Sequence, residues 1–178
     1  MTGPTALAAA LLSSGLLAGQ TAPTAPASAA PSFAGSCQFS GTVTFTPPLT
    51  TTPAPGTGAA HATGQCTGTL TDGSGHAHHL DAVPAGYQAS DAAANMDCEG
   101  GVATGAGTLT VASQRLGFAL TETRAGAVSA LQIQGRTWSA RGAASPGPQA
   151  NPVLLAAQCA GSGITSVPID ITLNSAAN

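Results

Sequence analysis

Large apolar and small polar side chains alternate with a period of two over most of the chain. Residues 39–46 read Phe-Ser-Gly-Thr-Val-Thr-Phe-Thr, so every second position carries serine or threonine. A large apolar residue likewise occupies every second position of 116–120 and 167–173. Successive side chains of an extended strand point to opposite faces, so this alternation predicts half-buried antiparallel strands.

Turn-forming residues separate these segments at near-regular intervals. About eight short strands at such spacing predict an all-β fold, either an antiparallel β-sandwich or a closed β-barrel. The 23 glycines and 13 prolines disfavour long helices. Only residues 90–95 have a sequence that could form a single helical turn. The turn segments are 47–58, 72–75, 84–86, 125–126, 145–148 and 161–163.

The 178 residues are enough for one domain of ordinary size. Residues 6–17 form an apolar run, and Ala27-Ser28-Ala29 fits the small-x-small rule for signal peptidase, which predicts cleavage after Ala29. The start of the chain departs from that pattern because it carries no lysine or arginine, and a disordered Ala/Pro tail is the alternative. We therefore expect a signal peptide at 1–29, a short linker at 30–36, an antiparallel β-domain at 37–174 and a tail at 175–178.

The four cysteines, Cys37, Cys66, Cys98 and Cys159, all follow the expected cleavage site. An even number of cysteines after an export signal predicts two disulfides in an oxidising compartment. No two of them have the Cys-x-x-Cys spacing of zinc or redox sites. Secretion to the extracellular space is the expected localisation.

Strand direction offers one argument about which cysteines pair. If strands run up and down over roughly 37–46, 60–71, 76–83 and 98–111, Cys66 and Cys98 lie near the same end of the sheet. Pairing of Cys66 with Cys98 would leave Cys37 with Cys159 by elimination. Whether these last two meet depends on Gly135, which is either a hairpin turn or a bulge within one long strand over 128–141.

Charged residues make up only 6% of the chain, with four arginines, no lysine and a net charge of −3. Four scattered arginines cannot form the basic stripe that neutralises phosphates, so nucleic-acid binding is excluded. No apolar run approaches the roughly 20 residues of a membrane-spanning helix. So few ionisable side chains predict no enzyme activity and no cofactor, because catalysis needs a positioned acid, base and orienting group.

Four segments resemble small secreted proteins of actinobacteria that have Thr/Gly-rich strands, four cysteines and no assigned activity. The resemblance implies secretion and an all-β fold, and it implies no particular chemistry. Its segments are 37–53, 66–71, 103–110 and 159–166.

Three of the four histidines lie in one short segment, Asp72-Gly-Ser-Gly-His76-Ala-His78-His79. On a strand, His76 and His78 would share one face, about 7 Å apart. With His61 or Asp72 as third ligand they could bind Zn²⁺ or Cu²⁺. The alternative is a polar strand beside a turn, with solvated imidazoles.

Asp91, Asn95, Asp97 and Glu99 form the one acidic cluster. Their oxygens could gather around Ca²⁺, or a carboxylate pair could serve glycoside hydrolysis, but the spacing matches no EF-hand loop. A solvated loop beside Cys98 is the favoured interpretation.

Two further patterns have a functional and a structural interpretation. Serines within 73–75 and 161–163 lie between glycines, which favours turns with positive φ over a nucleophile. Trp138 and Tyr87, with Arg136, could form a binding hot spot, or Trp138 could fill a core that has few aromatic residues.

These patterns lead to two functional hypotheses. The first is a secreted, non-enzymatic β-domain that has a binding or structural role at the cell exterior, with a small apolar ligand or a cell-surface partner. The second is an extracellular metal-binding protein that uses His76, His78 and His61.

Overall fold

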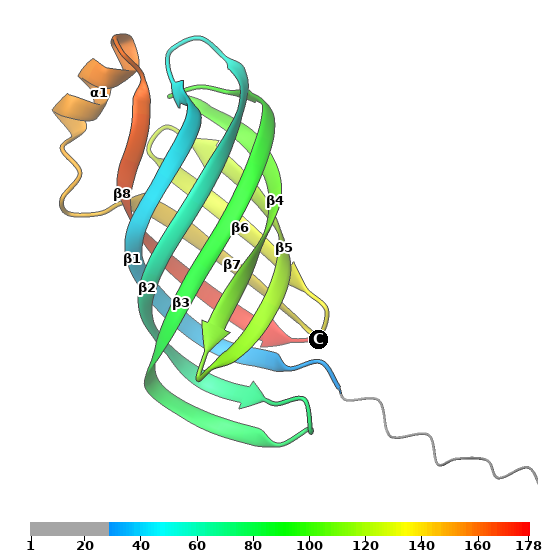
Figure 1. The fold of residues 1–178 in the computed structure, drawn as a ribbon. Coiled ribbons are helices and arrows are strands. Elements are labelled where there is room, and N and C mark those ends of the chain that lie inside the picture. The colour runs from blue at the N-terminus through cyan, green and yellow to red at the C-terminus, as the bar shows by residue number, and fades with distance from the viewer. Residues whose placement is uncertain (1–28) are drawn as a thin grey trace, which may run out of the picture.

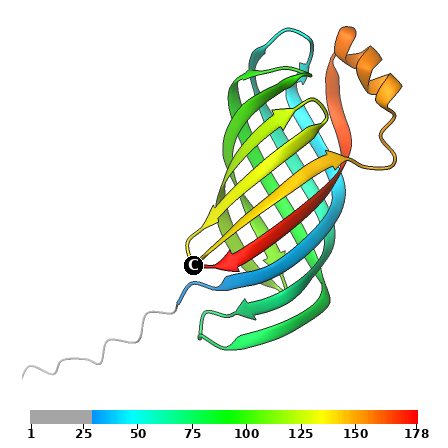
Figure 2. The same ribbon diagram turned by 180° about the vertical axis from the view of Figure 1, so that it is seen from behind.

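The computed structural model describes residues 29–178, and the expected signal peptide at 1–29 lies outside them except for Ala29. Eight antiparallel strands form a closed barrel in which every strand pairs with its neighbours in sequence and β1 pairs with β8 (Figure 1). The view from behind shows the same continuous wall (Figure 2). The all-β prediction is confirmed, and of its two architectures the barrel is the one observed.

The strands are long and strongly tilted, and one short helix lies between the last two. The elements are β1 (Ser32–Leu49), β2 (Ala54–Thr71), β3 (Ala77–Met96), β4 (Gly100–Val111), β5 (Gln114–Ala125), β6 (Val128–Gly135), β7 (Trp138–Pro146), α1 (Pro152–Ala160) and β8 (Ile164–Ala177).

The two ends of the barrel differ. The β2–β3 hairpin extends beyond the wall at one end, here called the hairpin end. The β3–β4 loop and α1 lie at the opposite end, here called the mouth.

Residues that alternate in the sequence point alternately into the barrel and out to the solvent. In β6 buried and exposed residues alternate without a break, with Leu131 and Ile133 inside and glutamines at 132 and 134 outside. All six aromatic residues of the chain, four Phe, one Tyr and one Trp, are buried. Burying them is favourable because each ring removes a large apolar area from water.

Four of these rings form a row across the interior. Their centroids are 5.9 Å apart for Phe39 and Tyr87, 5.6 Å for Tyr87 and Phe118, and 6.0 Å for Phe118 and Trp138. The row fills the barrel below the mouth. Gly107 on β4 makes room for it, because a Cβ there would lie 2.4 Å from Cζ of Phe118.

The single helical turn that the sequence allowed at 90–95 does not form. These residues continue β3, and Asp91 pairs with Gly58 of β2 and with Gly105 of β4. Pairing on both sides outweighs the weak helical preference of the Asp-Ala-Ala-Ala run.

The domain boundaries also differ from the expected ones. β1 begins at Ser32, so most of the predicted linker 30–36 belongs to the wall, and β8 extends to Ala177 through most of the predicted tail. Gly135 ends β6 directly before the turn to β7, which confirms the hairpin alternative.

Helix α1 is absent from the sequence-based prediction, although its start follows a common pattern. Asn151 caps it, and the side-chain oxygen accepts hydrogen bonds from the backbone N–H groups of Val153 and Leu154 at 3.0 and 3.2 Å. Pro152 occupies the first turn, where its missing N–H costs nothing.

Two disulfides are present, as predicted, but their pairing differs from the expected one. Cys37 bonds to Cys66, its direct partner across β1 and β2. Cys98 bonds to Cys159 and thereby joins the β3–β4 loop to α1.

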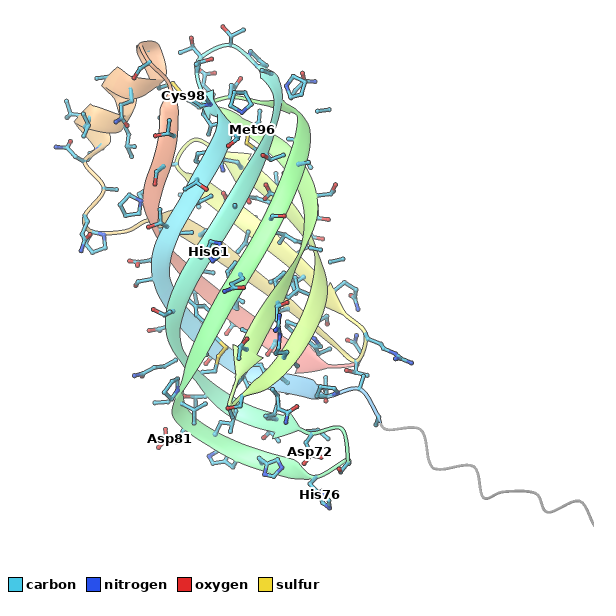
Figure 3. All side chains as sticks on the ribbon, viewed as in Figure 1. His61, Asp72, His76, Asp81, Met96 and Cys98 are labelled. Carbon is cyan, nitrogen blue, oxygen red and sulfur yellow. A yellow bond between two sulfur atoms is a disulfide. The ribbon has the colours of Figure 1, made fainter. Side chains whose placement is uncertain are left out.

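The expected pairing fails because β3 is much longer than the sequence suggested. Cys66 pairs with Val83 near the hairpin end, and β3 then continues to Met96 before Cys98 follows at the mouth (Figure 3). Fifteen residues of extended chain from Val83 to Cys98 span on the order of 50 Å. Cys66 and Cys98 therefore lie toward opposite ends of the barrel.

We expect Gly107→Ala to lower the free energy of unfolding by about 1–3 kcal/mol, because its Cβ would press on the Phe118 ring and the backbone of β3. Gly117→Ala on β5 is the matched control, since its Cβ would meet no atom within 4 Å. The control should stay within about 0.5 kcal/mol of the parent protein in urea unfolding. Equal stability of the two variants would contradict the proposed packing of the aromatic row.

Candidate functional site

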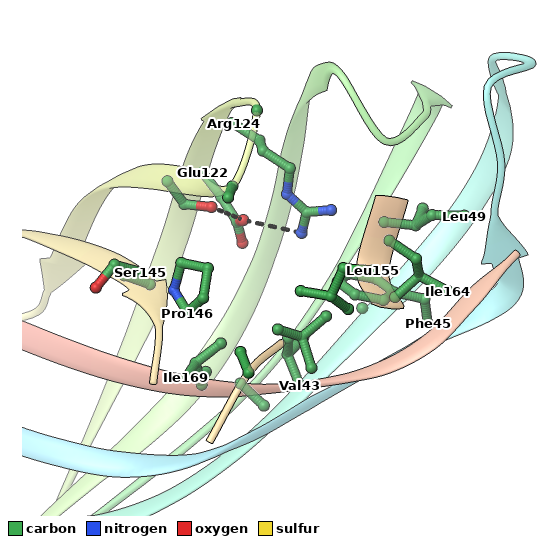
Figure 4. A pocket seen from close by; sticks show the side chains of 18 of the residues that line it. Val43, Phe45, Leu49, Glu122, Arg124, Ser145, Pro146, Leu155, Ile164 and Ile169 are labelled. Carbon is green, nitrogen blue, oxygen red and sulfur yellow. Dashed lines mark hydrogen bonds and ion pairs between the residues drawn. The ribbon is translucent and has the colours of Figure 1, made fainter. Parts of the chain in front are cut away.

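A cavity of about 540 Å³ lies at the mouth, between the aromatic row and α1 (Figure 4). Pockets of a few hundred cubic ångströms with mainly apolar walls are typical of small-molecule sites. β8 and neighbouring strands supply most of the aliphatic wall, and Tyr87 of the aromatic row also lines the cavity. The main aliphatic and aromatic lining residues are Val43, Phe45, Leu120, Leu131, Ile169 and Ile171.

One side of this wall is polar. Glu122 of β5 accepts a 2.6 Å hydrogen bond from the Ser129 hydroxyl and a 3.3 Å hydrogen bond from the Arg124 guanidinium, both on Oε1 (Figure 4). The side chains of Arg124 and Glu122 are only 11% and 14% exposed, so this ion pair is largely withdrawn from water. A buried ion pair costs desolvation energy on both partners, so its presence in an apolar chamber needs a reason.

Asp91 of β3 belongs to the same cluster, here called the polar cluster together with Glu122, Arg124 and Ser129. Its Oδ1 accepts a 3.0 Å hydrogen bond from the backbone N–H of Gly58. Its carboxyl group lines the cavity together with that of Glu122, and the two interact closely enough to affect the pKa of Asp91. Two carboxyl groups from separate strands thus meet inside the cavity.

Glycines make this meeting possible. Gly105 of β4 pairs with Asp91 and has no side chain to separate β3 from β5, and a Cβ there would lie 2.8 Å from Cβ of Asp91. On β2, a Cβ at Gly58 would lie 2.6 Å from Oδ1 of Asp91. Both positions therefore leave space for the Asp91 carboxyl.

Burial first, and then hydrogen bonding to Glu122 and its negative charge, raise the pKa of Asp91 from its ordinary value of 3.8 to about 7. The N–H of Gly58 and the charge of Arg124 oppose this effect. Two carboxylates in contact repel, so one of them retains a proton near neutral pH.

Arg124 and Tyr87 complete the polar wall. The guanidinium carbon of Arg124 lies 4.5 Å from the centre of the Phe45 ring, a favourable cation–π distance. Burial, followed by the negative charges of Glu122 and Asp91, raises the pKa of the Tyr87 phenol. The phenol therefore stays protonated at neutral pH.

Helix α1 borders the cavity from outside the barrel. Leu155, Ala156 and Cys159 line it, and the Cys98–Cys159 disulfide fixes the helix beside β8. Val153 and Leu154 point away and are 77% and 55% exposed. The helix buries no residue fully, so the disulfide is its strongest attachment.

The structure keeps His76 and His78 together but places His61, one of the expected ligands, apart from them. His78 Nε2 lies 3.0 Å and His76 Nδ1 3.7 Å from Oδ2 of Asp72, at the hairpin end (Figure 3). The hydrogen bond from His78 first, and then those from the backbone N–H groups of His76 and Ser74, lower the pKa of Asp72 to about 2.

His61 lies in the middle of the barrel wall, away from this group. Nine residues of β2 separate it from Leu70, the partner of His78, which is about 30 Å of extended chain. In residues 29–178, no three His, Cys, Asp or Glu side chains group closely enough to hold a metal ion.

The acidic residues at 91–99 do not form one site. Asp97 caps a turn, where its Oδ1 accepts hydrogen bonds from the N–H groups of Glu99 and Gly100, both at 2.8 Å. Asn95 is exposed, whereas Asp91 faces the interior. Neither a calcium loop nor a carboxylate pair between Asp97 and Glu99 results.

The remaining sequence candidates have structural roles. Gly75 and Gly163 adopt φ of 84° and 85°, which confirms the turn interpretation. Trp138 is only 1% exposed and packs edge-on against Phe118, so it fills the core, and Arg136 lies outside in the turn before it. The hot-spot hypothesis is wrong because its aromatic anchor is buried.

Sequence reasoning missed Glu122, Arg124 and Ser129, whereas it singled out Tyr87 as a binding candidate beside Trp138. A signal was nevertheless present in β5, where Glu122 and Arg124 occupy the same alternation phase as Leu116, Phe118 and Leu120. Charged residues in the inward phase of a strand predict a polar spot inside the barrel.

No protein-family model, no curated protein and no solved structure matches this chain. Within the described residues, no helix combines the length and apolar character needed to cross a membrane. The chemistry of the cavity is therefore the main indication of what this protein binds.

Asp91→Asn should change how stability depends on pH. The pKa of Asp91 is higher in the folded protein than its ordinary 3.8, so the folded state binds the proton more tightly. The free energy of unfolding should therefore fall as pH rises from about 4 to about 7. The variant should lack this fall and be more stable than the parent above about pH 7, by roughly 1–2 kcal/mol after allowance for water at the open mouth.

Urea unfolding over this pH range provides the measurement. Asp81→Asn, on the exposed face of β3, is the control and should follow the parent protein at every pH. Parallel pH profiles of the free energy of unfolding for Asp91→Asn and the parent would contradict the claim that Asp91 keeps a proton near neutral pH.

Proposed function

We propose that this chain is a secreted, non-enzymatic β-barrel that binds a small, largely apolar ligand in the mouth cavity. The observation that carries the proposal is an aliphatic chamber of about 540 Å³ with one compact polar cluster in its wall. Ligand sites commonly combine apolar walls with a few polar groups that fix orientation.

The architecture supports this proposal. A barrel of eight strands has an interior just wide enough to be filled by side chains or to hold one small ligand. Here the aromatic row fills one part of the interior, while small residues such as Ala60 and Ala89 line the part at the mouth. The space therefore depends on the choice of side chains.

The disulfides support an exterior location. Both Cys37–Cys66 and Cys98–Cys159 fit an oxidising, extracellular setting. Secretion by the expected signal peptide, and kinship with the actinobacterial proteins that the sequence resembles, are part of the proposal.

A binding role is simpler than catalysis for this cavity. The carboxyl groups of Asp91 and Glu122 hold each other, and Glu122 is further held by Ser129 and Arg124. We therefore assign these groups to ligand orientation.

Ala89→Phe should fill the cavity and weaken binding of N-phenyl-1-naphthylamine, an uncharged fluorescent probe, by about tenfold or more. Ala119→Phe, on the exposed face of β5, is the matched control and should bind like the parent. Probe fluorescence during titration gives both dissociation constants. Equal affinity of Ala89→Phe and the parent would show that the probe binds outside the cavity. A parent protein that binds no probe would contradict the proposed function.

Metal binding at the hairpin end is the second candidate, because His76 and His78 both face one oxygen of Asp72. The exposed imidazoles would need to turn toward a common ion, with Asp72 in place of the expected His61. In thermal unfolding, excess Zn²⁺ or Cu²⁺ should then raise the melting temperature of the parent and of His61→Ala, but not of His78→Ala. An unchanged melting temperature of the parent at metal excess removes this candidate.

A further inference from the structure

The lining of the cavity carries more carboxyl groups than cations. Asp91, Glu99 and Glu122 line it, and Arg124 is the single Arg, Lys or His among the described lining residues. Arg124 already faces Glu122 at 3.3 Å and lies over the Phe45 ring. With one proton shared by Asp91 and Glu122, Arg124 balances the charge of that pair, and Glu99 adds a further negative charge to the lining. This excess favours a positively charged group on whatever occupies the cavity.

Contacts within the polar cluster show where that charge would lie. Oδ1 of Asp91 accepts from Gly58, and Oε1 of Glu122 accepts from Ser129 and Arg124. Both carboxyl groups line the cavity, and their interaction, which raises the pKa of Asp91, favours a proton between them. A donor cation between them could replace this proton and satisfy both groups.

Tyr87 provides an independent observation. The residue is 1% exposed and lines the cavity, and its hydroxyl makes no hydrogen bond to another described residue. Within residues 29–178, no fully buried side-chain oxygen or nitrogen lacks a partner, so this hydroxyl is reachable from the cavity. A hydroxyl that is open to the cavity and has no hydrogen-bond partner in the wall can bind a polar group of a ligand.

We propose that the cavity binds an amphiphile with one primary ammonium group, which lies between the carboxyl groups of Asp91 and Glu122 while the apolar body contacts the aliphatic wall. This inference rests on the proposed function and narrows its ligand class. On binding, the shared O–H bond breaks and its proton passes to the solvent, while ammonium N–H groups donate to both carboxylates. The Tyr87 hydroxyl oxygen accepts a further N–H.

Surrounding elements add no competing cation. β3 contributes Asp91 and Tyr87, β5 contributes Glu122 and Arg124, and the β3–β4 loop contributes Glu99. The lining residues of β1, β2, β6, β7, β8 and α1 are apolar, small or hydroxyl-bearing and carry no ionisable group, since both of the lining cysteines are in a disulfide.

Three probes of equal chain length separate charge from apolar contact: dodecylamine, dodecanol and dodecanoic acid. In titration calorimetry of the disulfide-bonded protein below the micelle concentration, dodecylamine should bind at least about tenfold tighter than the other two. Binding heats in buffers of different ionisation enthalpy should show release of roughly one proton per amine near pH 6.

Variants of the carboxyl pair test the position of the ammonium. Asp91→Asn preserves the acceptor for Gly58 and should lose the preference for dodecylamine over dodecanol. Asp81→Asn should keep the preference. Glu122→Gln is the second variant if Asp91→Asn fails to fold, and proton release by the parent needs no variant.

The outcomes distinguish the two proposals. Equal binding of amine and alcohol, tightest binding of the acid, or a preference retained in Asp91→Asn overturns the ammonium inference and leaves the binding function in place. Absence of binding by all three probes overturns both.

Discussion

The pairing of β1 with β8 is the contact on which the rest of the barrel depends. It extends from Gly35 with Ser175 to Thr44 with Ser166, and it joins two strands that would otherwise expose unpaired edges. Closure turns one face of every strand inward, so a simple alternation in sequence encloses an interior. The register of this pair shifts between Thr44 and Leu49, at the mouth, where α1 lies beside the wall.

The few large side chains of the chain are distributed unevenly inside this closed wall. The aromatic row of Phe39, Tyr87, Phe118 and Trp138 fills the barrel below the mouth, whereas alanine and aliphatic residues surround the cavity above it. The polar cluster lies at the boundary, where glycines on β2 and β4 let Asp91 approach Glu122. An inward carboxyl pair lowers stability in an empty apolar chamber, and a bound cation would offset that cost.

Local patterns in the sequence predicted the strands well because each strand has an inward and an outward phase. They could not predict contacts between distant segments. The Cys37–Cys66 bond depends on the register of β1 and β2. The Cys98–Cys159 bond depends on the full length of β3, which includes an alanine run that is typical of a helix. The polar cluster was missed for a similar reason, since Asp91 and Glu122 meet only after β4 places β3 and β5 two strands apart.

The central claim is that Asp91 and Glu122 share a proton inside a cavity that accepts an ammonium group. ¹³C NMR of the side-chain carboxyl carbons, followed across pH without and with dodecylamine, tests it most directly. Our account predicts that Asp91 titrates near a pKa of about 7 in the free protein and at clearly lower pH with the amine bound. Titration of Asp91 near its ordinary value of 3.8 in the free protein, unchanged by the amine, would contradict it.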